Sequence, residues 1–176
     1  MSQSSLPSIE ALNSLARESF VQSLEVLFEG GGSLLEALWD RRPFESYQSM
    51  FEEAARVCDA LSAAQKTLLL NAHPRIGAPR VELERRSRLS YAEQGYGGSA
   101  AESGEERLNR ELARLNESYE ARFGFRFVVF VNRRSRATLL PVLRARMARS
   151  VEEEMATALG ELLAIARDRA SRLGGL

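Results

Sequence analysis

The chain has few of the features that mark proteins of oxidising or membrane surroundings. It has one cysteine, Cys58, so no disulfide can form within the chain, and the apolar spacing around it predicts a small buried hydrophobe in a reducing compartment. No apolar run approaches the ~18 residues of a membrane span, and no charged-then-apolar leader opens the chain. We therefore expect a cytoplasmic protein that does not enter a membrane.

An excess of charge of either sign is also lacking, since Lys+Arg and Asp+Glu number 24 each. The protein therefore has no net positive charge whose electrostatic field would attract nucleic acid or an anionic membrane. One stretch without acids is rich in arginine and, taken alone, suggests a nucleic-acid-binding helical protein. Its spacing distributes the arginines around Leu139 and Leu143, and no docking motif is recognisable, so we expect a solvated helix face and no nucleic-acid partner. These arginines are Arg133, Arg134, Arg136, Arg144, Arg146 and Arg149.

Helical periodicity is what the chain has in abundance. A length of 176 residues predicts one domain, residues 1–176, and a hydrophobic fraction of 44% can fill its core. Apolar residues recur at spacings of three and four, which predicts an all-α, single-domain helical bundle. Capping boxes mark helix starts at Ser62 and Ser150. We expect a stretch over 9–27 with one break, and helices over 34–39, 46–61, 62–73, 105–123, 137–147 and 151–173.

The segment Phe125 to Val131 departs from this pattern. It is aromatic and β-branched enough for a strand, yet no partner strand is evident in the sequence. Because a lone strand cannot satisfy its backbone polar groups, we expect either a short extended segment or the buried start of a helix.

The only histidine, His73, is followed by Pro74. Proline disfavours helix for the residue before it, so His73 should lie at the C-terminal end of a helix, outside the core. A structural reading makes His73 a polar cap, since a cation there stabilises a helix by roughly 0.3 to 1 kcal/mol. A functional reading makes this fixed position a place for proton transfer.

A second motif, Ser90 to Gln94, follows the polar loop over residues 77–89 and should open a short helix before a glycine-rich loop over 95–104. Ser90 and Glu93 lie three residues apart, on one side of a first helical turn. That spacing is also a plain capping box. Unlike the box at Ser150, this one has Gln94 beside it and comes soon after the only histidine.

In this order, the motifs resemble the 2-oxo-4-hydroxy-4-carboxy-5-ureidoimidazoline (OHCU) decarboxylases, a family acting between uric acid and allantoin. His73-Pro74 resembles the family's His-Pro pair, and Ser90 to Gln94 resembles its Ser-x-x-Glu-Gln motif. Leu115 to Tyr119, followed by Phe123 to Phe127, resembles its Leu-Asn-x-x-Tyr followed by Phe-Gly-Phe-Pro-Phe. Arg169 resembles the arginine of the family's closing helix. The similarity also covers Leu12-Asn13, Phe20 and Arg42-Pro43-Phe44. Two departures are Arg126, where the family usually has proline, and the glycine-rich loop, where it tends to be more apolar.

The resemblance implies an all-α carboxy-lyase that needs no cofactor or metal and converts OHCU to (S)-allantoin in urate degradation. It implies that His73, Glu93 and Arg169 are the catalytic residues. The substrate-binding residues that it implies are Pro74, Ser90, Gln94 and the backbone of Phe127, Val128, Val129, Phe130 and Val131.

Arg167 is a rival to Arg169 as the site arginine. Arg169 lies four residues after Ile165 and four before Leu173, so it should share their inward face, whereas Arg167 should lie off it. A guanidinium on an inward face is costly unless it is paired, and a substrate carboxylate or urea oxygen could pair it.

An alternative is a catalytically inactive helical scaffold that serves as an interaction module, although the expected site residues are all present. Helical faces with surplus apolar residues also make a homodimer an expectation.

Overall fold

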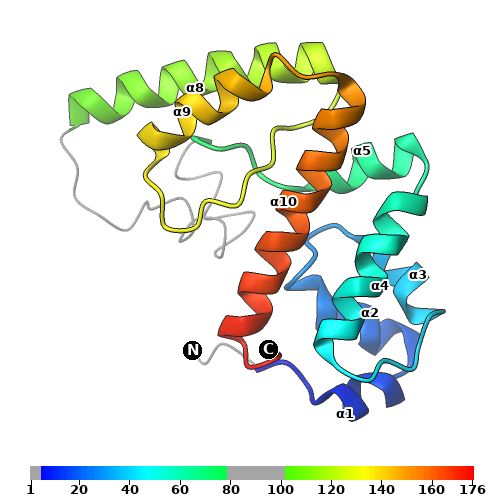
Figure 1. Ribbon diagram of the computed structural model, residues 1–176. Coiled ribbons are helices and arrows are strands. Elements are labelled where there is room, and N and C mark those ends of the chain that lie inside the picture. The colour runs from blue at the N-terminus through cyan, green and yellow to red at the C-terminus, as the bar shows by residue number, and fades with distance from the viewer. Residues whose placement is uncertain (1–4, 79–101) are drawn as a thin grey trace. The chain divides into compact units, whose positions relative to one another are not determined.

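The computed structural model describes residues 5–78 and 102–176, with the side chains of 102–106 excepted (Figure 1). Within these ranges every regular element is an α-helix and there is no strand, so the all-α prediction is confirmed. The helices are α1 (Ile9–Ser14), α2 (Arg17–Glu25), α3 (Gly32–Trp39), α4 (Tyr47–Ala60), α5 (Ala63–Ala72), α8 (Glu102–Phe123), α9 (Arg136–Arg146) and α10 (Val151–Arg172).

The chain divides into two compact units, each with its own internal contacts. Unit 1 comprises residues 1–72 and 159–176, and unit 2 comprises residues 73–158. Helix α10 begins in unit 2 and ends in unit 1. A single domain over residues 1–176 remains a prediction.

In unit 1, side-chain caps set several helix boundaries. The Ser8 hydroxyl accepts from the Ala11 N–H at the start of α1, and the predicted break in the 9–27 stretch falls at Leu15 and Ala16, between α1 and α2. The Ser46 and Ser49 side chains form a reciprocal capping box at α4. The predicted box at Ser62 is confirmed, because Gln65 accepts from the Ser62 N–H at 3.0 Å and donates its own N–H back to the hydroxyl.

Buried apolar side chains from each helix of unit 1 form its core, and each contributes about 1.5 to 3 kcal/mol by leaving water. They include Leu12 of α1, Phe20 and Leu24 of α2, Leu34, Leu35 and Leu38 of α3, Met50, Phe51 and Val57 of α4, Leu70 of α5 and Leu162 of α10.

A polar junction joins the end of α1 to the turn before α4. The Asn13 amide donates to the Phe44 carbonyl at 2.8 Å and accepts from the Phe44 N–H at 3.0 Å. The Arg42 guanidinium donates to the Leu15 carbonyl and lies 3.1 Å from the centroid of the Trp39 ring. These contacts bring Asn13 and the Arg42-Pro43-Phe44 turn, which lie far apart in the sequence, directly together.

Cys58 is buried in α4, as predicted, and burial raises the pKa of its thiol to about 12. At pH 8 we expect the native thiol to react with a disulfide reagent on the order of a thousandfold more slowly than in guanidinium chloride, because reaction requires local opening. Equal thiol reactivity in native and denatured protein would contradict this packing.

Burial also raises the pKa of the Tyr47 hydroxyl to about 12. The pKa values of Cys58 and Tyr47 are both raised on folding, so the free energy of unfolding should fall as the pH rises above about 9.

Unit 2 contains α8, α9, the start of α10 and the segment Phe125 to Val131. Helix α8 already begins at Glu102, so the expectation of a loop through Gly104 is wrong for its last three residues. The Ser135 side chain caps α9, and the predicted capping box at Ser150 is confirmed by a 2.9 Å bond from the Ser150 N–H to Glu153. In the described ranges, no helix is long and apolar enough to cross a bilayer.

Candidate functional site

His73 immediately follows α5, at the helix end predicted from Pro74. The expectation of a position outside the core is wrong, because only 5% of the residue is exposed. Neighbouring segments of unit 2 cover the chain after the helix, which the helix boundary alone could not indicate. A buried imidazole is shielded from bulk water, so its position fits a proton-transfer group better than an exposed cap.

Three side chains of unit 2 hold the turn that begins at His73. Arg126 Nη1 donates to the His73 carbonyl oxygen at 2.9 Å. Arg75 makes a bidentate ion pair with Glu120 of α8, with both N–O distances at 2.7 Å. Asn116, also of α8, donates from Nδ2 to the Ile76 carbonyl at 2.9 Å. Contacts over this whole stretch make the turn a rigid support for the imidazole.

Gly77 lets this turn approach α8 closely. Its φ of 76° lies in the left-handed region, where a side chain is unfavourable. A Cβ there would come within 2.8 Å of the Leu112 side chain. Glycine therefore meets both a conformational and a steric requirement at this position.

The segment Phe125 to Val131 is neither helix nor strand, so the first of its two predicted structures is correct and the buried helix start is excluded. It follows Gly124, whose φ of 80° terminates α8 and whose N–H bonds to the Glu120 carbonyl. Phe125 and Phe127 are buried and contact the Tyr119 ring edge-on, with centroid distances of 5.9 and 5.2 Å. Aromatic packing therefore holds a segment that has no strand partner in the described ranges.

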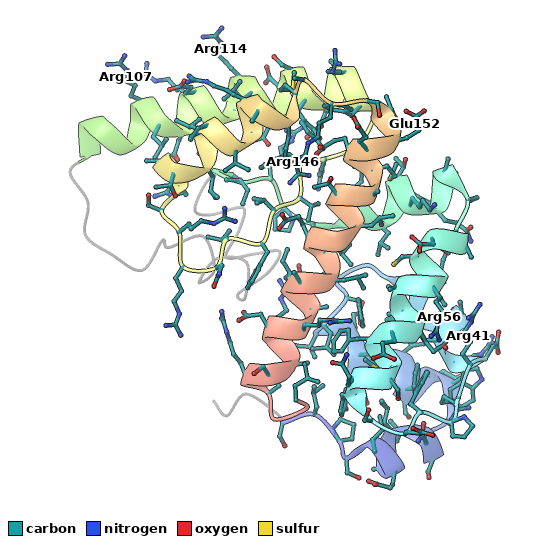
Figure 2. All side chains as sticks on the ribbon, viewed as in Figure 1. Arg41, Arg56, Arg107, Arg114, Arg146 and Glu152 are labelled. Carbon is teal, nitrogen blue, oxygen red and sulfur yellow. The ribbon has the colours of Figure 1, made fainter. Side chains whose placement is uncertain are left out.

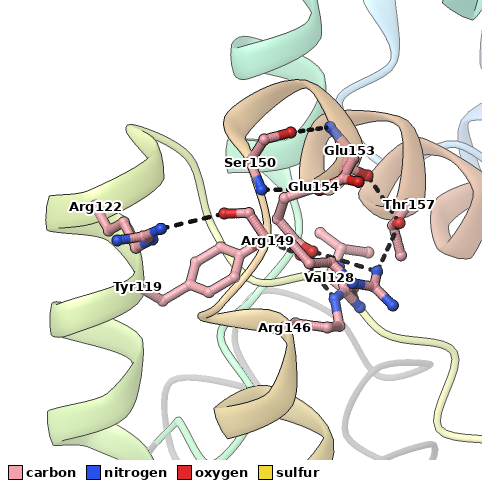
Figure 3. Close-up of polar contacts among 9 residues, drawn as sticks. All are labelled: Tyr119, Arg122, Val128, Arg146, Arg149, Ser150, Glu153, Glu154 and Thr157. Carbon is pink, nitrogen blue, oxygen red and sulfur yellow. Dashed lines mark hydrogen bonds and ion pairs between the residues drawn. The ribbon is translucent and has the colours of Figure 1, made fainter.

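A buried polar network also anchors this segment (Figure 3). Tyr119 donates its hydroxyl to Glu154, and Arg146 donates from Nε to the same carboxylate oxygen at 2.7 Å. Arg146 Nη1 also donates to the Val128 carbonyl at 2.9 Å. Burial, followed by the bond to Glu154, raises the pKa of Tyr119. The network therefore connects α8, α9 and α10 to the backbone of the proposed pocket segment.

The prediction of a solvated arginine face is wrong for Arg136 and Arg146, which are both buried. Arg136 donates to Asn109, and Arg146 pairs with Glu154. In Figure 2 the Arg146 side chain points inward, whereas Arg107 and Arg114 point away from α8. The spacing argument failed because the helix is covered by neighbouring segments on more than its leucine face.

Arg169 belongs to unit 1 and lies on the inward face of α10, as predicted, with 1% of the residue exposed. Its Nη1 lies 3.5 Å from Glu29 Oε1 and 3.4 Å from the Val26 carbonyl oxygen. Arg167 is only partly buried and lies over the Phe51 ring, 5.4 Å from its centroid. The structure therefore distinguishes the two arginines by burial and by partner.

Glu29 was not singled out by the sequence. It is a lone acid just before three glycines, and no spacing within the chain indicates that its partner is an arginine of the last helix. Arg126 and Glu154 were missed as contact residues for the same reason, since both act on segments distant in sequence.

Ser90, Glu93 and Gln94 lie outside the described residues, so their roles remain predictions. The structure places His73, Pro74 and residues 127–131 in unit 2, and Arg169 in unit 1. Among the described side chains, no group of three His, Cys, Asp or Glu residues could hold a metal ion.

Comparison with known proteins agrees with the sequence motifs. Residues 13–171 match the family described as OHCU decarboxylase. A relative named putative 2-oxo-4-hydroxy-4-carboxy-5-ureidoimidazoline decarboxylase from Homo sapiens is 30% identical over 88% of each chain. The corresponding decarboxylase of Mus musculus is 29% identical over 93% of this chain and 91% of its own.

A solved structure supports the same fold. The crystal structure of an OHCU decarboxylase in the presence of (S)-allantoin superimposes with a TM-score of 0.65 and 21% identity, covering 90% of this chain and 98% of the other. The resemblance found in the sequence is thereby confirmed: this chain belongs to the OHCU decarboxylase family.

Proposed function

We propose that this chain is a carboxy-lyase that converts OHCU to (S)-allantoin in urate degradation. The family match over residues 13–171 carries the proposal. The support from this chain's own structure is its single histidine, which is buried and whose carbonyl is bound by Arg126 of a largely buried apolar segment.

The chemistry needs no external electron sink. In OHCU the carbon that bears the carboxylate also carries a hydroxyl and adjoins a C=N carbon. When the C–C bond to the carboxylate breaks, CO2 leaves and its bonding electrons flow into the imine. The protein must orient the carboxylate out of the ring plane, take the hydroxyl proton, and return a proton to one face of the enol-like intermediate. Delivery to one face gives allantoin of one hand.

His73 is the proposed proton carrier. Histidine can accept and return a proton near neutrality, and such catalysis is typically worth ~10² to 10⁴-fold. Glu93 would accept N–H groups of the ureido chain or ring, and Ser90 and Gln94 would add hydrogen bonds. Pro74 and the backbone of residues 127–131 would line the pocket beside His73.

Arg169 is the proposed anion-binding residue. Its planar guanidinium can bind a carboxylate or a urea oxygen through two parallel hydrogen bonds. Its burial supports this role, because a guanidinium shielded from water binds an anion more strongly. The Glu29 carboxylate, 3.5 Å away, lowers the cost of burying the cation before a ligand arrives.

The test of function is the decay of freshly prepared OHCU, followed by circular dichroism with and without the protein. Spontaneous decay gives racemic allantoin, so an enzyme should give faster decay and an excess of the S enantiomer. An inactive scaffold would leave both the rate and the racemic outcome unchanged. A homodimer in the cytoplasm remains a prediction, and sedimentation would test the dimer.

The assignment of Arg169 over Arg167 predicts different binding of allantoin by two lysine variants. Arg169→Lys should weaken binding about tenfold, because lysine keeps the charge but loses the bidentate geometry. Arg167→Lys should bind allantoin as the parent does, because Arg167 lies off the inward face over the Phe51 ring. Calorimetric titration of both variants measures the effect. Parent affinity in the Arg169 variant with lost affinity in the Arg167 variant would reverse the assignment.

A further inference from the structure

Arg126 occupies an unusual position between two buried anchors. The side chains of Phe125 and Phe127, on either side of it in the sequence, are buried against Tyr119. The backbone of Arg126 is therefore held in place, and its half-buried guanidinium has a restricted reach. Because its backbone is held in place, the Arg126 side chain can fix the position of a segment that it contacts.

The segment that it contacts is the one that carries the histidine. Arg126 Nη1 lies 2.9 Å from the His73 carbonyl oxygen. Helix α5 ends at Ala72, so this carbonyl has no place in the helical hydrogen-bond ladder. A hydrogen bond from a cationic donor is stronger than one between neutral groups, so the contact holds the His73 peptide group firmly.

The other two contacts on the turn act farther along the chain. Arg75 and Glu120 pair two residues after the histidine, and Asn116 bonds to Ile76. Only the Arg126 bond acts on the peptide group of His73 itself, among the contacts described above. Its loss would leave the turn attached to α8 but would remove a charged hydrogen bond from the carbonyl of the residue that carries the imidazole.

We propose that Arg126 is a positioning residue for His73. Its hydrogen bond orients the imidazole, and the residue does not touch the substrate. The catalytic part of this inference rests on the proposed function, whereas the orientation of the ring does not. A misplacement of about 1 Å can cost on the order of 10²-fold in rate, so a loosened peptide is enough to lower turnover.

Arg126→Met is the informative variant, because methionine keeps an unbranched apolar stem and removes the donors. We expect kcat to fall roughly tenfold and KM to stay within about twofold, with a near-parent melting temperature. Arg126→Lys, which restores a cationic donor, should recover most of the lost kcat.

The matched control is Arg122→Met. Arg122 also donates from its guanidinium to a backbone carbonyl, that of Arg149 at 3.2 Å, but it lies at the exposed surface of α8. The same substitution there removes the same kind of bond without touching the His73 turn. We expect parent values of kcat and KM.

A second measurement does not depend on activity. Because the chain has one histidine, its imidazole C–H signals in an NMR spectrum of the untagged protein belong to His73 alone. Arg126→Met should shift or broaden these signals, and Arg122→Met should leave them unchanged. Parent ring signals and parent kcat in Arg126→Met would overturn the proposal, as would a lysine variant that recovers nothing. A parent protein without turnover would refute the proposed function, while the ring signals would still decide whether Arg126 orients His73.

Discussion

His73→Gln is expected to lower the turnover of OHCU by roughly 10² to 10⁴-fold, the typical contribution of a positioned acid–base group. Glutamine is chosen because the imidazole is buried, and alanine would leave a cavity whose cost could be mistaken for a catalytic effect. The amide fills similar space but cannot accept and return a proton near neutrality. Steady-state kinetics by circular dichroism and a melting curve measure the two effects separately.

The pH dependence of the same variant supplies the control. Histidine is the only side-chain type with an ordinary pKa, about 6.5, between pH 5 and 8. The chain contains one histidine, so the rate of His73→Gln should change less between pH 5 and 8 than the rate of the parent does. A variant that melts like the parent and keeps most of its rate would show that the proton carrier lies elsewhere.

Glu154→Gln is expected to lower the free energy of unfolding by about 3 kcal/mol, because it leaves the Arg146 cation buried without its counter-charge. The Arg146 side chain is 4% exposed and that of Glu154 is 0% exposed, and their closest atoms are 2.5 Å apart. The substitution keeps the size of the side chain, so the loss would report mainly the charge. Urea-induced unfolding measures it.

Arg144 and Glu111 offer a matched control in the same unit. They also form an Arg–Glu ion pair, but their side chains are 59% and 36% exposed. Glu111→Gln should therefore change the free energy of unfolding by less than about 1 kcal/mol. Equal losses at Glu111 and Glu154 would mean that burial does not determine the strength of these pairs.

The buried pair also bears on the proposed pocket. Arg146 donates to the Val128 carbonyl and lies 4.5 Å from the centroid of the Phe127 ring. A displaced Arg146 side chain would therefore release Phe127 and Val128, which belong to the segment that lines the proposed pocket. An unfolding experiment and the allantoin titration on one Glu154→Gln sample would show stability and binding declining together.

Local rules were enough to predict most helices from the sequence. The helix starts at Ser46, Ser62 and Ser150 could be read from the sequence, because a helix end depends on residues within about four positions of one another. The sequence also indicated one break in the 9–27 stretch, which the structure places at Leu15 and Ala16. The inward position of Arg169 was readable too, since one helical period relates it to Ile165 and Leu173.

Contacts between distant segments had to come from the tertiary structure. The sequence by itself determined most of the described helices, the family motifs and the position of His73 after a helix end. Only the fold decided that His73 is buried, that Arg126 holds its carbonyl, and that Glu29 lies beside Arg169. The physical reason is that burial and ion pairing depend on which segments pack together, and no periodicity within a single helix encodes that choice.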